Sequence, residues 1–256
     1  MIRLGTSGFS YDDWVGPVYP EDLPRLQWLS FYAQQFDTVE LNVTFYRVPG
    51  KKTVAGWVER TPPEFAFSVK ANRELTHERS APDFGSFRVG IGPLIESGKL
   101  ACILAQFPHS FHPNAENRAY LGRLREGLEG LPVVVEFRDR AWVTEQTFGQ
   151  LAELSLGFCA VDEPKLSGLM PAVAKATGPL AYVRFHGRNA AKWWEHEHAW
   201  ERYDYSYSEA ELREWVPKIR GLEAESSAVL VYANNHYRGQ SIEAIRKLRE
   251  LLGEVH

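Results

Sequence analysis

Short apolar, β-branched runs alternate with amphipathic stretches along the whole chain. Eight runs have the composition of strands: 2–8, 38–42, 65–71, 100–107, 132–139, 157–163, 180–187 and 227–234. Between most of them, apolar residues recur every three or four positions, which predicts helices over 23–36, 51–60, 114–128, 144–154, 208–222 and 240–252. This alternation predicts an α/β fold with a parallel sheet, and eight strands close a (β/α)8 TIM barrel.

The segment 164–179, after the sixth strand, departs from this pattern. It is interrupted by Pro164, Gly168, Pro171 and Gly178, so we expect an irregular connection there. The sequence contains no repeat and no Gly/Ser-rich linker. We therefore predict a single domain over residues 1–256.

A doubly wound open sheet is the alternative architecture. It would place a glycine-rich phosphate turn after the first strand, opening directly into a helix. The sequence GTSGFSYDDWVGPVYP (5–20) instead forms an aromatic and proline-rich stretch before the helical pattern begins at Leu23. The barrel is therefore favoured.

Composition narrows the class of protein. The 256 residues suit one barrel, and 44% hydrophobic with 24% charged residues is typical of a globular protein. A net charge of -4 does not favour nucleic acid or an anionic membrane as partner. No apolar run approaches the roughly 18 residues of a membrane span, and the N-terminus lacks a signal-peptide pattern, so we predict a cytoplasmic protein. Only Cys102 and Cys159 are present, and we expect both to be buried free thiols.

Polar side chains stand at the C-terminal ends of nearly all the predicted strands, where a barrel gathers its reactive groups. These residues are Thr6, Ser7, Glu40, Asn42, Ser68, Lys70, Gln106, Glu136, Arg138, Asp162, Arg184, His186, Asn234 and His236. Residues two apart on a strand face the same side. Three pairs should therefore share a face: Glu40 with Asn42, Glu136 with Arg138, and Arg184 with His186.

The residue types predict a site for a small anion. Lys70, Arg138 and Arg184 could hold a carboxylate or phosphate, and Glu40, Glu136, Asp162 and His186 are the candidates for acid–base catalysis. Further substrate-binding candidates are Asn42, Gln106, Asn234 and Asn235, which could orient hydroxyl groups, and Tyr46 and Tyr237, which could stack on a ring. The four acid–base candidates could also bind a divalent metal. This interpretation is less favoured, because the three nearby cations could already balance their negative charge. The sequence therefore does not identify a cofactor.

Two other tracts have weaker chemical meaning. WWEHEHAW (193–200) has histidines between glutamates, but their i, i+2 spacing does not fit a zinc-protease helix, so we expect a loop over the barrel mouth. GTSG (5–8) could cradle a phosphate with backbone N–H groups, although such turns are common. Ser7 lacks the surroundings of a nucleophile elbow.

Six motifs in order along the chain resemble the YecE-like family, the domain of unknown function seventy-two. They are GTSGFSYDDWVGPVYP (5–20), YAQQFDTVELNVTFYRVP (32–49), TPPEFAFSVKANRELTH (61–77), VEFRDRAW (135–142), YVRFHGR (182–188) and YANNHYRGQS (232–241). The resemblance implies a TIM-type barrel and no particular reaction. Phe9, Asp139 and Ala233 depart from the pattern, standing where Trp, His and Phe are expected.

Three hypotheses for the function follow from these residues. The leading one is a barrel enzyme using acid–base chemistry on a small anionic substrate, such as a sugar phosphate or a nucleotide-like compound. A metal-dependent nuclease or phosphoesterase and a non-catalytic metabolite-binding protein are the alternatives. The sequence does not determine the oligomeric state.

Overall fold

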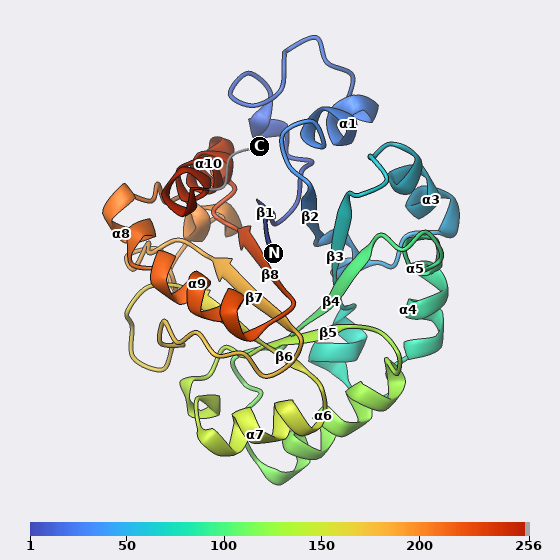
Figure 1. Cartoon of the computed structure of the whole chain (residues 1–256), viewed down its shortest axis with the longest axis vertical. Helices are drawn as coiled ribbons and strands as arrows, with labels where there is room; N and C mark the ends of the chain where they lie inside the picture. The colour runs from blue at the N-terminus through green and yellow to red at the C-terminus, as the bar shows by residue number, and fades with distance from the viewer. Residues whose placement is uncertain (254–256) are drawn as a thin grey trace.

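Eight parallel strands form a nearly closed barrel in the computed structural model, which describes residues 1–253 (Figure 1). The strands are β1 (Ile2–Thr6), β2 (Thr38–Leu41), β3 (Ala66–Lys70), β4 (Leu100–Gln106), β5 (Val133–Glu136), β6 (Gly157–Asp162), β7 (Leu180–Phe185) and β8 (Ala228–Ala233). Their order in the sheet is β1-β8-β7-β6-β5-β4-β3-β2, with parallel pairing throughout. The predicted (β/α)8 barrel is confirmed.

The barrel closes where β1 approaches β2. Ser7 forms an isolated parallel bridge with Glu40, and the Gly8 N–H donates to the Glu40 carbonyl oxygen at 2.8 Å. A Cβ atom on Gly5 would lie 2.3 Å from the Thr38 carbonyl oxygen. Only glycine allows the two backbones to come this close.

The helices lie outside the strands, with α3 to α5 and α8 to α10 on different parts of the ring (Figure 1). Four agree closely with predicted ranges: α3 (Lys51–Glu59), α6 (Ala115–Gly127), α7 (Glu145–Glu153) and α10 (Gln240–Leu252). Helices α2 (Val43–Tyr46), α4 (Phe84–Gly90) and α5 (Gly92–Glu96) were not predicted, and they are short. The segment 164–179 contains neither helix nor strand, as expected.

Two predicted helices are wrong in extent, and proline contributes to both differences. Over 23–36 the chain forms only a 3-10 turn (Arg25–Gln27) and α1 (Trp28–Tyr32), because Pro24 is extended, with ψ 139°. Over 208–222 it forms α8 (Glu209–Arg213) and α9 (Val216–Glu225), and Pro217 stands in the first turn of α9. A proline in the interior of one long helix would remove a backbone hydrogen bond.

Two tyrosines occupy the barrel interior beneath the C-terminal ends of the strands. The rings of Tyr182 and Tyr232 lie 5.1 Å apart, and the Tyr232 hydroxyl lies 2.6 Å from Thr38 Oγ1 and 2.9 Å from Ser68 Oγ. Every one of these hydroxyl groups is paired, as burial requires. Cys102 and Cys159 are buried free thiols, as predicted. Within residues 1–253, none of the helices combines the length and apolar character needed to cross a bilayer.

Candidate functional site

A buried ion-pair network lies directly above the tyrosines. Arg184, from β7, donates through Nη2 to Glu40 Oε1 and through Nη1 to Glu136 Oε2, both at 2.7 Å. The Tyr182 hydroxyl donates to the other Glu40 oxygen at 2.7 Å. Both carboxylates are fully shielded from solvent, and buried carboxyl groups are costly without hydrogen-bonded partners of this kind. One guanidinium therefore joins β2 and β5 across the barrel.

Arg138 extends this network toward the mouth. Its Nε lies 2.8 Å from Glu136 Oε1, and its Nη1 donates to Glu163 Oε2 at 3.3 Å. Burial alone would raise the pKa of Glu136, but Arg138, Arg184 and His186 outweigh it and hold that pKa well below its usual range. Glu136 is thus held as a carboxylate. The sequence predicted Glu136 and Arg138 on one face, and the structure brings them together.

His186 is buried and neutral. Its Nε2 lies 3.1 Å from Glu136 Oε1, and Asn234 Nδ2 lies 3.1 Å from its Nδ1. Burial and the nearby Arg138 lower the pKa of His186 to about 3. With the proton on Nε2, the ring donates to Glu136 and accepts from the Asn234 amide, so both ring nitrogens are satisfied. His186 therefore positions Glu136 and Asn234 beneath the mouth.

Lys70, at the end of β3, faces the same mouth with no acceptor for its amine. Nζ lies 4.5 Å from the centre of the Phe45 ring, and within residues 1–253 the amine makes no hydrogen bond or ion pair. Burial and the charge of Arg184 lower the pKa of Lys70 to about 7, although Glu136 and Glu40 oppose this shift. Near neutral pH the amine is therefore present in both its neutral and its charged form.

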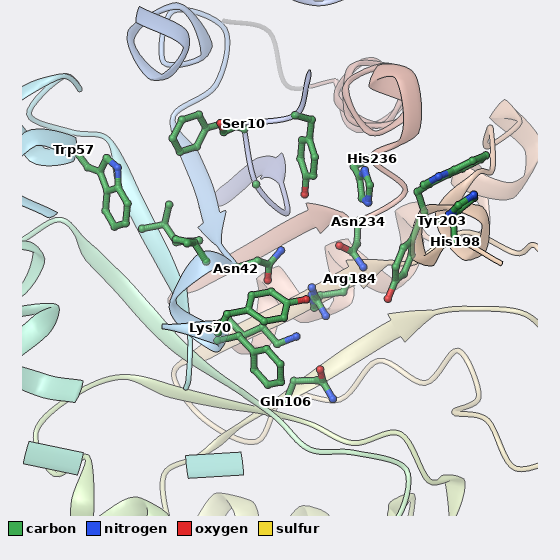
Figure 2. Close-up of a pocket in the computed structure, with 18 of the residues that line it drawn as sticks. Ser10, Asn42, Trp57, Lys70, Gln106, Arg184, His198, Tyr203, Asn234 and His236 are labelled. Atoms are coloured by element: carbon green, nitrogen blue, oxygen red, sulfur yellow. The ribbon is translucent and has the colours of Figure 1, made fainter. Parts of the chain in front are cut away.

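A cavity of about 780 Å³ opens above these groups. Figure 2 shows Lys70, Arg184, Asn42 and Gln106 gathered at one end of it, with Trp57 on one side and His198 and Tyr203 on the other. The described residues that line the cavity include one lysine and two arginines, Lys70, Arg138 and Arg184. They include no aspartate or glutamate. The remaining wall is largely aromatic or apolar: Phe9, Tyr11, Leu41, Val43, Phe45, Tyr46, Trp57, Trp200 and Tyr203.

The mouth also contains polar atoms without partners. Asn42 Oδ1 and Arg184 Nε are buried and make no hydrogen bond within the described part of the chain, and both side chains line the cavity. The His236 ring is stacked on Tyr11 with 4.3 Å between ring centres, and its Nδ1 is likewise unpaired. Buried polar atoms are usually hydrogen-bonded, so these atoms indicate where a ligand or water would bind.

Six predicted site residues do not line the cavity: Glu40, Glu136 and His186 lie in the network beneath it, and Asp162, Asn235 and Tyr237 lie elsewhere. Asp162 is on the outer face of β6, where it accepts from the Tyr207 hydroxyl and Trp215 Nε1, both at 2.6 Å, and pairs with Arg188 at 2.7 Å. Asn235 donates to the Tyr205 carbonyl oxygen at 2.8 Å, and the Tyr237 ring stacks on Trp200 with 4.3 Å between ring centres. Asn42, Tyr46, Gln106 and Asn234 line the cavity as expected.

Sequence reasoning missed Glu163, which takes the place expected for Asp162. Cys159 faces the barrel interior, 4.0 Å from Glu136, so the two-residue period of a strand turns 161 and 163 inward and 162 outward. Burial raises the pKa of Glu163 to about 7, against the opposing charge of Arg138. The strand period counted from Cys159 points to Glu163 only once the side that Cys159 faces is known, and the sequence does not give that side.

The structure brings together only three of the four predicted metal ligands. Glu40, Glu136 and His186 lie in the barrel interior, whereas the Asp162 side chain lies on the outer face of β6. The three interior groups are already paired with arginine or with one another. Within residues 1–253, three metal-type ligand atoms converge only at Glu197, His198 and Glu201. Glu201 is already bound to Lys192 at 2.9 Å.

The tract 193–200 is a loop as far as His198, in agreement with the prediction, and its last two residues begin a 3-10 turn (Ala199–Tyr203). His198 and Trp200 line the cavity together with Tyr203. Trp193 is buried, whereas Trp194 is 56% exposed. The first turn, GTSG, contributes Gly8 to the cavity, and its Ser7 is fully buried, 3.4 Å from Arg184 Nη2.

The fold and this mouth define a (β/α)8-barrel protein with a buried ion-pair network beneath a cation-lined cavity. Residues 3–256 match the family described as "Protein of unknown function DUF72", and the chain belongs to that family. It is 33% identical over 270 residues to the UPF0759 protein YunF of Bacillus subtilis (strain 168), covering 98% of this chain and 95% of YunF. The resemblance to the YecE-like family is thereby confirmed.

Solved structures of the family have the same fold. A DUF72 family protein from Thermotoga maritima MSB8 is 40% identical, with a TM-score of 0.92 over 99% of this chain and 100% of that chain. One from Enterococcus faecalis V583 is 29% identical, with a TM-score of 0.89 over 100% of this chain and 97% of that chain. These similarities establish the family and its barrel, and their descriptions name no reaction.

Proposed function

We propose that this protein is a barrel enzyme that binds a small anionic substrate in the mouth cavity and acts on it by acid–base chemistry. The observation that carries the proposal is the charge of the lining: Lys70, Arg138 and Arg184 face the cavity, whereas the neighbouring carboxylates are turned onto arginines. A substrate carboxylate or phosphate would face cations and no competing carboxylate.

The network beneath the mouth favours particular roles for its residues. Glu40 and Glu136 would hold Arg184 and Arg138 in position, and His186 would hold Glu136 and Asn234. Lys70 is better suited to proton transfer than the carboxylates first considered, because it faces the cavity and its pKa is about 7. Asn42, whose Oδ1 is unpaired within the described residues, would accept a hydrogen bond from a substrate hydroxyl.

The cavity also favours a substrate with a flat or apolar part. Phe9, Tyr46 and Trp57 lie in its wall with further aromatic rings, and aromatic faces stack on bases and sugars. A sugar phosphate or nucleotide-like compound combines such a part with an anion. Two free buried thiols are consistent with the reducing cytoplasm as the location.

Calorimetric titration with sulfate tests the anion site directly. We expect the wild-type protein to bind sulfate and Arg138→Gln to bind it at least about tenfold more weakly, since a charged hydrogen-bonding partner is lost. Arg213→Gln is the matched control, because Arg213 is 65% exposed and pairs with Glu209 on α8. Equal binding by all three proteins, or none by the wild type, would refute the proposal.

The metal-dependent alternative has a separate test. It requires the purified protein to contain a divalent ion whose loss abolishes activity, and the three interior ligands are already occupied by one another and by arginine. Elemental analysis of the purified protein would detect such an ion. Sulfate binding to the proposed anion site should in addition be unchanged when a chelator is present.

A further inference from the structure

Lys70 differs from a buried structural lysine in having no partner for its amine. Lys99 is such a lysine: its Nζ donates to the Val58 carbonyl oxygen at 2.9 Å, the Thr61 carbonyl oxygen at 2.8 Å and Thr61 Oγ1 at 2.9 Å. Those three acceptors use all the hydrogens of an ammonium group. Lys70 Nζ faces the cavity with only the Phe45 ring beside it.

The surroundings of Lys70 disfavour its ammonium form. Within residues 1–253 the amine has no carboxylate in ion-pair contact, since Glu40 and Glu136 are both turned onto Arg184. Burial acts most strongly against protonation of the amine, and the charges of Arg184 and Arg138 add to it, although Glu136 and Glu40 oppose the shift. A desolvated lysine beside other cations has a lone pair available for attack on carbon.

The same arginines would bind the anionic group of a substrate beside this amine. Lys70, Arg138 and Arg184 line one cavity, and Figure 2 shows Lys70 beside Arg184 at its base. A ligand whose carboxylate or phosphate lies on Arg184 would therefore have its adjoining carbons within the part of the cavity that Lys70 faces. Proximity of this kind converts a slow bimolecular addition into a reaction within one complex.

We propose that Lys70 is a nucleophile that forms an imine with an anionic aldehyde or ketone. The inference rests on the proposed function, because it requires the anion site. The neutral amine attacks the carbonyl carbon, a C–N bond forms, and the C=O π pair moves to oxygen. The oxygen then leaves as water with two hydrogens that came from nitrogen, giving C=N. One carbonyl compound and one amine yield one imine and one water, with no redox change.

Reductive trapping on the intact wild-type protein tests this. The probes are glyoxylate, an anionic aldehyde, and propanal, a neutral one, each with sodium cyanoborohydride at pH 7, followed by peptide mapping with mass spectrometry. We expect the glyoxylate adduct at Lys70 to form at least about tenfold faster than at Lys99 or the exposed Lys51, because more of its amine is neutral. Sulfate should slow only the glyoxylate reaction of Lys70, and propanal, which has no anionic group for the arginines, should label Lys70 more slowly than glyoxylate does.

The outcomes separate this inference from the anion site. If sulfate binds the wild type and Lys70→Arg but no adduct forms preferentially at Lys70, the nucleophile is refuted while the anion site stands. If sulfate does not bind and Lys70 is no more reactive than Lys51, both proposals fail. If propanal labels Lys70 as fast as glyoxylate does, the proposal that the substrate is anionic is refuted.

Discussion

Arg184 Nη1 donates to Glu136 Oε2 at 2.7 Å in the interior of the barrel, where the two side chains are 2% and 0% exposed. This contact links β7 to β5, and the second Nη group of Arg184 links both to Glu40 on β2. Charges so fully desolvated are stable only while every partner is present. The network is therefore both the floor of the cavity and a structural element.

Arg184→Met should destabilise the protein by about 3–5 kcal/mol, because Glu40 and Glu136 would lose their shared cation while remaining buried. Urea unfolding measures the change. Adding Glu136→Gln to Arg184→Met should recover part of the loss, since one uncompensated charge is removed. Arg213→Met, on an exposed pair, should cost below about 0.5 kcal/mol. A loss of similar size in both single variants would contradict the account.

Glu163 should make stability fall with rising pH. Its folded pKa of about 7 exceeds the ordinary 4.5, so the folded state holds the proton more tightly than the unfolded chain does. The contribution of Glu163 to the free energy of unfolding is fully present below about pH 4.5 and is lost as the pH rises to about 7. The free energy of unfolding of the wild type minus that of Glu163→Gln should decrease over this window. Denaturant titrations at several pH values measure it, and a constant difference would show that the carboxyl titrates normally.

The eight strands were predictable because each is an apolar run bounded by turn-forming residues. The two-residue period also predicted the pair Glu136 with Arg138, which are in contact, and the pair Arg184 with His186, which both contact Glu136. The pattern failed at Asp162 and Glu163, since two acidic residues in succession at a strand end leave the inward position ambiguous. The partners of Asp162, Tyr207 and Trp215, lie about 50 residues further along the chain, and no local pattern reveals that contact.

Local sequence could not specify the state of Lys70 either. Composition suggested a cation for binding an anion, whereas its lowered pKa follows from burial and from Arg184, which lies on a distant strand. The turn at Arg79, with φ 60°, and the π-helical turn Glu74–Glu78 that precedes it were likewise not predicted, because they contradict simple helical periodicity.

Asp162→Asn should reduce stability while leaving sulfate binding unchanged. The carboxylate accepts from Tyr207 and Trp215 and pairs with Arg188, so its loss should cost about 2–3 kcal/mol. Its side chain does not line the mouth cavity. Thermal unfolding and sulfate calorimetry on the same preparation measure the two effects. Loss of sulfate binding by a folded Asp162→Asn protein would instead support the catalytic role first considered for this residue.

Lys70→Met should lower the affinity for sulfate and remove its dependence on pH near neutrality. Lys70 has a folded pKa of about 7 against an ordinary 10.5, so its positive charge disappears from the cavity as pH rises through 7. Sulfate keeps its two negative charges over this range, which makes the protein the source of any change. Calorimetry between about pH 6 and 8.5 should show wild-type affinity falling with pH and the variant's staying nearly constant.

The stability of the same two proteins provides an independent measurement of that pKa. The unfolded chain binds the Lys70 proton more tightly than the folded state does, so the free energy of unfolding of the wild type relative to Lys70→Met should rise as pH increases from about 7 toward 10.5. This stabilisation is complete only above the pKa of Lys70 in the unfolded chain, and it is lost as the pH falls through the pKa of Lys70 in the folded protein. Because Lys70 makes no hydrogen bond through its amine within the described residues, Lys70→Met should fold normally. A difference that stays flat from pH 7 to 10 would mean that Lys70 retains an ordinary pKa, and the neutral amine required for imine formation would then be scarce at pH 7.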